Sequence, residues 1–352
     1  LVNFPTLVAT NAARVVLAAG GDSVLEFGLR RAQGPDGGLS ASRAAYLGGC
    51  EATSNELAGR LFGIPVRGTH AHSWILSFSD EQEAMDTWAE VQPQNTVLLV
   101  DTFDTLDGVR RAIETGKRMR EEGHELDGIR LDSGDLAYLS REARRLLDEA
   151  GFPDARIVAS SDLDPETIAS LREQGAEVDT WGVGTRLVTA YEQPALGGVY
   201  KLAAVRRGPE EEWRMTVKVS ADPDKTTVPG ILGARRYYDK AGRAAADMIH
   251  DTASDSEPGD SVVDPVNPRR RKSIDPSWRQ EELLVPTLRG GELVTELPDL
   301  ATSRARAQEQ LASFHPGVLR RLNPHRYPAG LDIGLHRRRE ALVESALEGR
   351  VG

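Results

Sequence analysis

The chain has 352 residues, which is enough for one large domain or two ordinary ones, and its apolar fraction of 39% is typical of a globular protein. Its 54 acidic and 43 basic side chains give a net charge of -11, which argues against a general affinity for nucleic acid or anionic membranes. Its longest apolar runs fall short of the roughly 20 residues that a transmembrane helix needs. The composition therefore favours a small molecule as the partner.

The single cysteine, Cys50, excludes an internal disulfide, and residues 1–20 lack the pattern of a secretory signal. We therefore expect a cytoplasmic protein. The stretch LVNFPTLVATNAARVVLAAG at the start of the chain predicts a helix that is already in progress at Leu1. From this we expect the natural protein to begin upstream.

From residue 62 to 190 a short apolar run repeatedly ends in small and polar residues and leads into an amphipathic helix. The repeats begin with IPVRGTHAHSWI (64–75), NTVLLVDTFDT (95–105), GIRLDSGDL (128–136), ARIVASSDLD (155–164) and EVDTWGVGTRL (177–187). If the last four strands end at Asp101, Asp132, Ser160 and Gly182, their spacings of 31, 28 and 22 residues correspond to one βα unit each. The repeat predicts parallel strands joined by right-handed crossovers.

A parallel barrel and an open doubly wound sheet both fit this rhythm. The barrel is favoured because polar residues follow every strand, whereas a doubly wound sheet concentrates its site at one switch point. After residue 200, VYKLAAVRR, WRMTVKVS and ARRYYD alternate like antiparallel strands. We predict an irregular α/β barrel over 1–205 and a smaller, mostly antiparallel α+β domain over 206–352.

Two further segments of the predicted smaller domain are charged. Residues 254–273 are rich in turn-forming residues and predict an exposed connection, and the tail from residue 302 predicts Arg-rich helix. The basic runs Arg269–Lys272 and Arg337–Arg339 are interpreted as solvated faces, which is the usual role of such runs.

Side chains at the carboxyl ends of barrel strands meet at one mouth. The candidates for this mouth are Asp101, Asp104, Arg130, Asp132, Asp135, Ser160, Ser161 and Asp162. Asp and Ser residues are also preferred helix caps, and for Asp104, Ser161 and Asp164 capping is the favoured interpretation. An arginine within a strand is costly to bury without an anion, so Arg130 is expected to pair with one.

Three other patterns suggest binding or catalysis. In DTWGVGTRL, Gly182, Gly184 and Thr185 would let backbone amides approach a phosphate, although the same pattern can be a simple tight turn. In EFGLRRAQG, Arg30 and Arg31 suit carboxylate or phosphate binding, with a surface helix as the alternative.

In GTHAHSWI, His70 and His72 would point the same way on a strand and could form a metal pair. No further histidine lies on the later strands to complete such a site, since His124 falls in a loop between a helix and a strand. The remaining options are a packed core histidine, or one histidine that acts as nucleophile or acid–base group.

Five motifs in order resemble the nicotinate phosphoribosyltransferase family. They are FGLRRAQG, GTHAHS, RLDSGDL, GVGTRL and KVSADPDKTTVPG. The resemblance implies an irregular α/β barrel with a smaller domain, in a homodimer whose active sites lie near the subunit boundary. It also implies NAD biosynthesis, in which nicotinate reacts with phosphoribosyl pyrophosphate, Mg²⁺ assists, and ATP hydrolysis is coupled as in a ligase.

The resemblance also implies a role for each candidate residue. Arg30 and Arg130 would flank nicotinate and the phosphates, Asp132 would hold the ribose hydroxyls, and Ser133 would face the sugar phosphate. Gly182, Gly184 and Thr185 would cradle the 5′-phosphate. His72 matches the histidine that the family phosphorylates from ATP, and His70, at a position usually apolar in the family, is expected to be dispensable. The residues that hold the metal are left open.

The sequence departs from the family pattern in two places. The N-terminal segment, which supplies part of the smaller domain and an aromatic residue that stacks on the pyridine ring, does not appear, and Cys50 and Glu51 stand where an aromatic residue and Asp are expected. Two alternatives therefore stay open: a metal-dependent barrel hydrolase that uses His70 and His72, and an inactive nucleotide-binding remnant.

Overall fold

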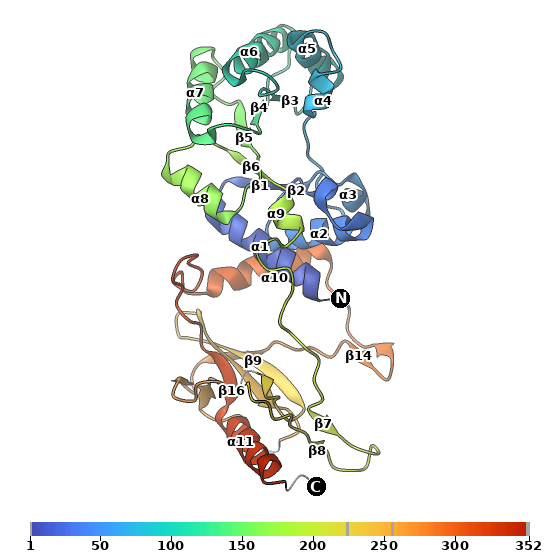
Figure 1. Cartoon of the computed structure of the whole chain (residues 1–352), viewed down its shortest axis with the longest axis vertical. Coiled ribbons are helices and arrows are strands. Elements are labelled where there is room, and N and C mark those ends of the chain that lie inside the picture. Colours follow the sequence, from blue (N-terminus) through green and yellow to red (C-terminus); the bar gives the residue numbers. More distant parts are fainter. Residues whose placement is uncertain (1, 223–224, 255–256, 350–352) are drawn as a thin grey trace. The chain divides into compact units, whose positions relative to one another are not determined.

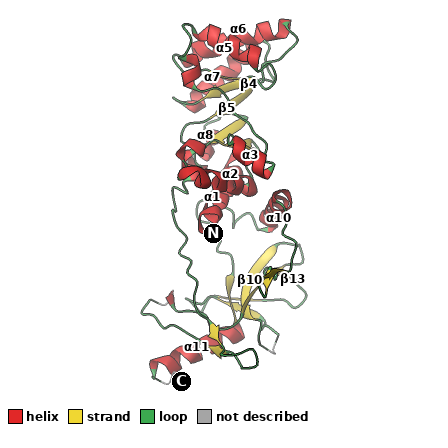
Figure 2. Ribbon diagram, turned by 90° about the vertical axis from the view of Figure 1, so that its right-hand side faces the viewer, coloured by secondary structure: helices red, strands yellow, loops and turns green. Residues whose placement is uncertain are grey.

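The computed structural model describes residues 2–222, 225–254 and 257–349. The chain divides into two compact units, one of Leu1–Gly197 with Asp299–Gln308 and the other of Gly198–Pro298 with Glu309–Gly352. Figure 2 shows that helices surround the sheet of the first unit, whereas strands make up most of the regular structure of the second. None of the helices among the described residues is long and apolar enough to cross a membrane.

The first unit is built on a curved, six-stranded parallel sheet (Figure 1). Its strands are β1 (Ser23–Glu26), β2 (Ala52–Thr53), β3 (Val97–Leu99), β4 (Gly128–Leu131), β5 (Arg156–Ala159) and β6 (Thr180–Val183). The order β2-β1-β6-β5-β4-β3 follows the chain around a circle and brings the first strand beside the sixth. A doubly wound sheet would reverse direction at a switch point. The predicted barrel architecture is therefore confirmed, as a half-barrel whose sheet ends at β2 and β3.

Helices alternate with these strands. They are α1 (Asn3–Ala19), η1 (Leu29–Arg31), α2 (Gly34–Gly48), α3 (Glu56–Phe62), α4 (His72–Ile75), α5 (Glu81–Val91), α6 (Thr105–Glu121), α7 (Leu136–Glu149), α8 (Pro165–Glu173) and α9 (Thr185–Val188). The helix expected at the start of the chain is confirmed as α1.

The core of this unit lies between the sheet and its helices. Leu98, Ile129, Ile157 and Trp181 occupy alternate strand positions that are completely buried. Full burial of such a side chain is worth about 1.5–3 kcal/mol. The intervening positions face the inside of the half-barrel, because successive strand residues point to opposite faces. The apolar strand interiors thus fix which polar residues reach the carboxyl edge.

Three aspartates begin helices directly after strands. The carboxylates of Asp104, Asp135 and Asp164 accept the backbone N–H three residues on, at the N-termini of α6, α7 and α8. Capping by Asp104 and Asp164 is confirmed. Asp135 was expected at the mouth and instead caps α7, while Ser161, expected as a cap, leaves that role to Asp164.

One predicted strand does not form. In the segment 64–75, Val66 makes only an isolated bridge to Thr53, and His72 already begins α4. The glycine and polar residues between Val66 and His72 offer no continuous apolar run to bury in a sheet. The first repeat of the sequence pattern is therefore an extended connection rather than a βα unit.

The second unit contains a mixed six-stranded sheet in the order β12-β11-β16-β10-β9-β13. The strands are β9 (Leu232–Tyr238), β10 (Ala244–Asp251), β11 (Ser261–Val263), β12 (Arg271–Ser273), β13 (Arg279–Glu282) and β16 (Ala329–Asp332). Only the β10–β16 pair is parallel, so the expectation of a mostly antiparallel sheet is confirmed. Two small hairpins join β7 (Ala204–Val205) to β8 (Arg214–Met215) and β14 (Leu288–Arg289) to β15 (Glu292–Leu293).

The remaining helices are α10 (Leu300–Ser313) and α11 (Ile333–Leu347), with β16 between them, so the tail is helical only in part. The prediction of an exposed connection over 254–273 is wrong at β11, because Val262 and Val263 are buried in the sheet, whereas β12 is a strand whose residues are exposed. Residues 255 and 256 of that segment lie outside the described residues. Arg339 was expected on a solvated face but is buried, and its guanidinium donates to the carbonyls of Thr226 and Thr227.

Candidate active site

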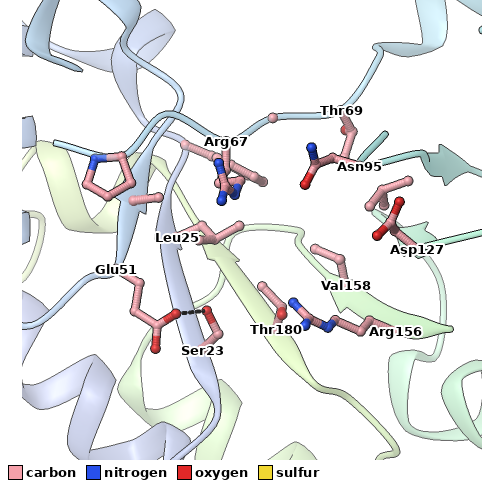
Figure 3. Close-up of a pocket in the computed structure, with 15 residues that line it drawn as sticks. Ser23, Leu25, Glu51, Arg67, Thr69, Asn95, Asp127, Arg156, Val158 and Thr180 are labelled. Carbon is pink, nitrogen blue, oxygen red and sulfur yellow. Dashed lines mark hydrogen bonds between the residues drawn. The ribbon is translucent and has the colours of Figure 1, made fainter. Parts of the chain in front are cut away.

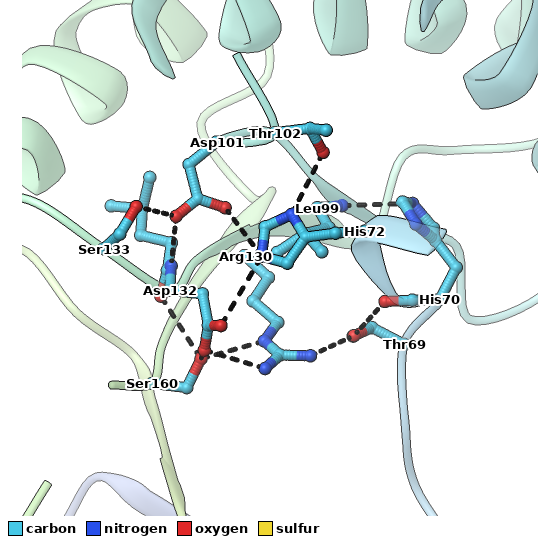
Figure 4. Close-up of polar contacts among 11 residues, drawn as sticks. Thr69, His70, His72, Leu99, Asp101, Thr102, Arg130, Asp132, Ser133 and Ser160 are labelled. Atoms are coloured by element: carbon cyan, nitrogen blue, oxygen red, sulfur yellow. Dashed lines mark hydrogen bonds and ion pairs between the residues drawn. The ribbon is translucent and has the colours of Figure 1, made fainter. Parts of the chain in front are cut away.

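Polar side chains converge at the carboxyl edge of the parallel sheet (Figure 4). Arg130 lies near the end of β4, with Asp132 directly after it, and Ser160 follows β5. Asp101 and Thr102 follow β3, and His72 begins α4. Four separate segments therefore supply one cluster, as the repeated strand ends predicted.

The guanidinium of Arg130 is held on three sides. Its Nε donates to Ser160 Oγ, its Nη1 to Thr69 Oγ1 and its Nη2 to Asp132 Oδ1, each at 2.9 Å. The group also lies over the ring of Phe27, 5.5 Å from the centroid. The expectation that a strand arginine would pair with an anion is confirmed, with Asp132 as the partner.

Asp132 is kept ionised by these neighbours. Burial alone would raise the pKa of its carboxyl, but the charge of Arg130 and hydrogen bonds from Ser160 and Arg130 outweigh burial and lower the pKa. Its Oδ1 accepts the hydrogen bonds from Arg130 and Ser160, which leaves Oδ2 directed at the ring of His72. One oxygen thus anchors the carboxylate and the other faces a reactive group.

Asp101 fixes the loop that carries Asp132. Its Oδ2 accepts the backbone N–H of Asp132 at 2.9 Å and the hydroxyl of Ser133 at 2.5 Å. Its Oδ1 is buried and has no hydrogen-bond partner. The unpartnered oxygen lies 4.0 Å from His72 Nε2. A buried carboxylate oxygen without a partner is costly, which marks this position as functional.

The ring of His72 is placed between a hydroxyl and these two carboxylates. Nδ1 is 3.1 Å from Thr102 Oγ1, and Nε2 is 3.6 Å from Asp132 Oδ2. The side chain is 39% exposed, so the ring remains open to a ligand. This arrangement orients an imidazole and surrounds one of its nitrogens with negative charge, which suits a nucleophile or an acid–base group.

His70 has a different environment and is a packed core residue. Its Nε2 accepts the backbone N–H of Leu99 in β3 at 3.1 Å, and its ring meets Trp88 edge-on at 5.1 Å. Burial lowers the pKa of His70 to about 4. The idea that His70 and His72 form a metal pair is wrong, because residues 69–71 are not a strand and the two rings have separate partners.

Two cavities open at this edge of the sheet. One, of about 210 Å³, is lined by Arg30, Arg31, Arg130, Asp132, Ser160, Ser161, Asp162, Gly182, Gly184 and Thr185. The other, of about 230 Å³, is lined by Arg30, Thr69, His72, Arg130 and Asp132 among others. The residues expected at the mouth from three separate motifs therefore meet there, with Arg130 and Asp132 on both cavities.

Gly182 in the glycine motif leaves room for the aromatic ring of Phe27. A Cβ on Gly182 would stand 2.7 Å from the ring of Phe27, so only glycine fits at this position. Beside it, Ser161 and Asp162 have φ angles of 111° and 42°, which are unusual for residues with side chains. Strained backbone of this kind gathers at ligand sites, and both residues line the cavity of Gly182.

Arg30 and Arg31 lie on the exposed turn η1 and form no ion pair with another described residue. Glu26 holds the segment before this turn in place. Its buried carboxylate accepts the backbone N–H of Gly28 and the hydroxyls of Ser42 and Thr53. Sequence reasoning missed Glu26. A glutamate at the end of an apolar strand was the available signal.

Three further placements bear on the expectations. Ser133 lies at the same edge, but its hydroxyl is engaged by Asp101. Cys50 is fully buried, and burial raises the pKa of its thiol to about 12. The carboxylate of Glu51 accepts the hydroxyl of Ser23 at 2.7 Å.

The inside of the half-barrel holds a cavity of about 330 Å³ (Figure 3). It is lined by Leu25, Arg156, Val158 and Thr180 from the sheet, and by Glu51 and Arg67 among others. Phe27 and Thr69 line both this cavity and those at the carboxyl edge.

Two sets of acids could be considered for a metal. Asp101 Oδ1 and Asp132 Oδ2 both face the mouth, and two carboxylates together with substrate phosphates are the ligands typical of Mg²⁺. Asp164, Glu166 and Glu192 also gather within 4.8 Å. Asp164 is already engaged as a helix cap and with Arg186, so we assign that cluster no metal.

The chain is similar to known enzymes over nearly its whole length. Residues 233–338 match the family model of the nicotinate phosphoribosyltransferase C-terminal domain. The nicotinate phosphoribosyltransferase of Bacillus subtilis is 41% identical over 337 residues, which cover 94% of this chain and 67% of that protein. The human enzyme of the same name is 36% identical, with 99% of this chain and 74% of the human protein covered.

Solved structures give the same result for the fold. The crystal structure of human nicotinic acid phosphoribosyltransferase matches with a TM-score of 0.78 and 31% identity, over 97% of this chain and 75% of that one. Nicotinate-nucleotide pyrophosphorylase from Pyrococcus furiosus matches with a TM-score of 0.65 and 23% identity, over 89% of this chain and 71% of that one, which shows a shared fold.

Proposed function

The chain belongs to the nicotinate phosphoribosyltransferase family, and on that premise we propose how its barrel mouth performs the reaction. The reaction transfers the phosphoribosyl group of phosphoribosyl pyrophosphate to nicotinate, gives nicotinate mononucleotide and pyrophosphate, and serves NAD biosynthesis. The observation that carries the residue roles is the position of His72 Nε2, 3.6 Å from Asp132 and 4.0 Å from Asp101.

In the transfer step, the pyridine nitrogen forms a bond to C1 of the ribose while the bond from C1 to the pyrophosphate oxygen breaks. The electron pair of that bond leaves with pyrophosphate. Because the transition state resembles an oxocarbenium ion, the protein acts mainly by placing charge and by orienting two anionic reactants. The guanidinium groups of Arg30 and Arg31, which form no ion pair within the described part of the chain, are suited to binding phosphate or carboxylate oxygens.

Arg130 acts chiefly by holding the carboxylate of Asp132, since all its nitrogens already have partners. Asp132 would accept hydrogen bonds from the ribose hydroxyls. Gly182, Gly184 and Thr185 line the cavity of Arg30 and Arg31 and would surround the 5′-phosphate with backbone N–H groups and a hydroxyl. The role of Ser133 is limited to supporting this loop through Asp101.

Mg²⁺ would be held by Asp101 Oδ1 and Asp132 Oδ2 together with oxygens of the pyrophosphate group. When bound, the ion neutralises negative charge that develops on the leaving group. The buried, unpartnered Oδ1 of Asp101 supports this assignment, because a cation there would compensate its lost hydration.

ATP is the proposed co-substrate, with His72 as phosphoryl acceptor. If Nδ1–H donates to Thr102 Oγ1, the lone pair of Nε2 is free to form a bond to the γ-phosphorus while the bond to the leaving ADP oxygen breaks. Water later hydrolyses the phosphohistidine and releases inorganic phosphate. Asp101 and Asp132 stabilise the positive charge that develops on the ring during this transfer.

The test is pyrophosphate release from phosphoribosyl pyrophosphate and Mg²⁺, with nicotinate or nicotinamide, with and without ATP. We expect nicotinate-dependent release that ATP stimulates. The variant His72→Ala should retain slow release and lose the stimulation. In the same variant, phosphate release from ATP and acid-labile labelling of the protein by the γ-phosphate should also disappear.

His124→Ala is the matched control, since His124 lies outside both mouth cavities. Unchanged stimulation by ATP in His72→Ala would refute the phosphohistidine role. No release with either base would favour an inactive, nucleotide-binding protein.

The family also supports a homodimer and a cytoplasmic location, which sedimentation velocity and cell fractionation would check.

A further inference from the structure

A basic pocket of about 320 Å³ lies in the second unit, beside the hairpin of β11 and β12. Four of its cations, Arg269, Arg270, Arg271 and Lys272, are consecutive in the chain. Arg326, more than 50 residues later in the sequence, contributes a fifth. A charged stretch and a distant arginine are therefore brought to one concave surface.

Most of this positive charge is not compensated. Asp264 is the acid that lines the pocket, and its Oδ2 lies 2.7 Å from Arg326 and 3.8 Å from Arg270. Arg269, Arg271 and Lys272 have no acidic partner among the described residues. Five cations against one carboxylate leave a net charge of +4 on the pocket, in a chain whose net charge is -11.

The loop that carries the cations is held in place by hydrogen bonds from the side chain of Asp264 and between its own backbone groups. Asp264 Oδ1 accepts the N–H groups of Val266 and Asn267, at 3.0 and 3.2 Å. The N–H of Asp264 donates to the carbonyl of Arg270 at 3.0 Å, and the N–H of Arg270 to the carbonyl of Asn267 at 2.8 Å. These hydrogen bonds keep the arginines close together, so the loop cannot move them apart to reduce their mutual repulsion. A bound anion would reduce that repulsion.

The simplest alternative is that these residues keep an exposed strand from pairing with other chains, since β12 is an edge strand. That explanation covers Arg271 and Lys272. It does not cover Arg269 and Arg270, which lie in the loop before β12, or Arg326, which comes from another segment. Nor does it account for the hollow, whose volume lies within the range of ligand pockets.

We propose that this pocket binds a polyphosphate group, either free or as part of a nucleoside triphosphate. Guanidinium groups bind phosphate oxygens in a bidentate manner, and a triphosphate carries negative charge that matches the pocket. The concave shape and the acidic chain favour a small polyanion over an extended nucleic acid. The site goes beyond the proposed catalytic function and does not depend on it.

Calorimetric titration of the whole chain with inorganic triphosphate tests the proposal, with nicotinate mononucleotide, which carries a single phosphate, present to occupy the barrel mouth. The double variant Arg269→Gln/Arg271→Gln should lose roughly tenfold or more in affinity, because it removes two guanidinium groups that would donate charged hydrogen bonds to the anion. Arg207→Gln/Arg337→Gln removes the same charge from exposed positions of the same unit and should leave the affinity within about twofold.

Equal affinities of the two double variants would overturn the proposal. So would tighter binding of a single-stranded oligonucleotide than of triphosphate, because that result would identify a nucleic-acid surface. Comparison of ATP with inorganic triphosphate separates the two sources of the group. Nicotinate-dependent release of pyrophosphate from phosphoribosyl pyrophosphate should be unchanged in the pocket variant, which distinguishes a failure of this proposal from a failure of the catalytic one.

Discussion

Arginines lie both at the carboxyl edge of the parallel sheet and in the hairpin of β11 and β12 in the mixed sheet. Their guanidinium groups are used in opposite ways in these two places. At the sheet edge, Arg130 is 16% exposed, and each of its three guanidinium nitrogens donates to one partner, Ser160, Thr69 or Asp132. At the hairpin, Arg269 and Arg271 are exposed and have no acidic partner among the described residues. Arg130 is paired within the chain and positions the carboxylate proposed to act in catalysis, whereas arginines without an acidic partner are available to a ligand.

Removal of Arg130 should produce the largest effect. In Arg130→Ala the carboxylate of Asp132 loses its ionic partner and its fixed orientation, so we expect kcat/KM to fall about 10²–10³-fold or more. Arg130→Lys should recover little, because one ammonium cannot replace the three-sided guanidinium contact. Steady-state pyrophosphate release measures this.

Arg110→Ala, on the exposed face of α6, is the control for loss of an arginine and should retain full activity. If Arg130→Ala stays within about tenfold of the unmodified chain, the network at the sheet edge is not what orients the reactants.

His70 should control a pH dependence of stability. Its pKa of about 4 lies below that of a histidine in the unfolded chain, so the unfolded state binds the extra proton between these values. Stability should therefore be complete above about pH 6.5 and fall by up to roughly 3 kcal/mol as the pH drops towards 4. Urea denaturation at several pH values should show a flatter profile for His70→Gln.

His124→Gln provides the comparison, since His124 lies in a partly exposed loop between α6 and β4. The difference in stability between the two variants should grow as the pH falls below 6.5 and should be largest at about pH 4 and below. A profile for His70→Gln that parallels that of the unmodified chain would mean that His70 is protonated in the folded state.

The smallest effect is expected at the hairpin. Arg269→Gln/Arg271→Gln should change the free energy of unfolding by no more than about 0.5 kcal/mol, because both side chains are exposed and form no ion pair with the residues that the structure describes. Thermal and urea unfolding would measure this. A loss above roughly 1 kcal/mol would show that the arginines stabilise the fold, and would remove the contrast with Arg130.

The barrel could be predicted because its signal is local and repeated. Asp101, Asp132, Ser160 and Gly182 follow apolar runs at spacings of one βα unit, and parallel strands necessarily bring such residues to one edge. The same logic failed at residues 64–75, where an extended connection between Val66 and His72 resembles the end of a strand. Nothing in the local pattern shows that no neighbouring strand is available there.

The sequence predicted which residues would lie near one another at the sheet edge better than it predicted the contacts among them. Arg130, Asp132 and His72 were expected at the mouth, and the structure brings them together. The supporting roles of Glu26 and Thr69 depend on contacts across 27 and 61 positions of sequence, which no periodicity encodes. The sequence also did not show that His70 and His72 have separate environments, because the orientation of the two rings depends on the helix that begins at His72.

The ring of Phe27 is shared by three spaces, the interior of the half-barrel and both cavities at its mouth. It also occupies the room that a side chain on Gly182 would need and lies beneath Arg130. The three spaces are therefore compartments with one common wall. A substitution at position 27 would remodel all of them at once, so the ligand selectivity of one cannot be redesigned through this residue without altering the others.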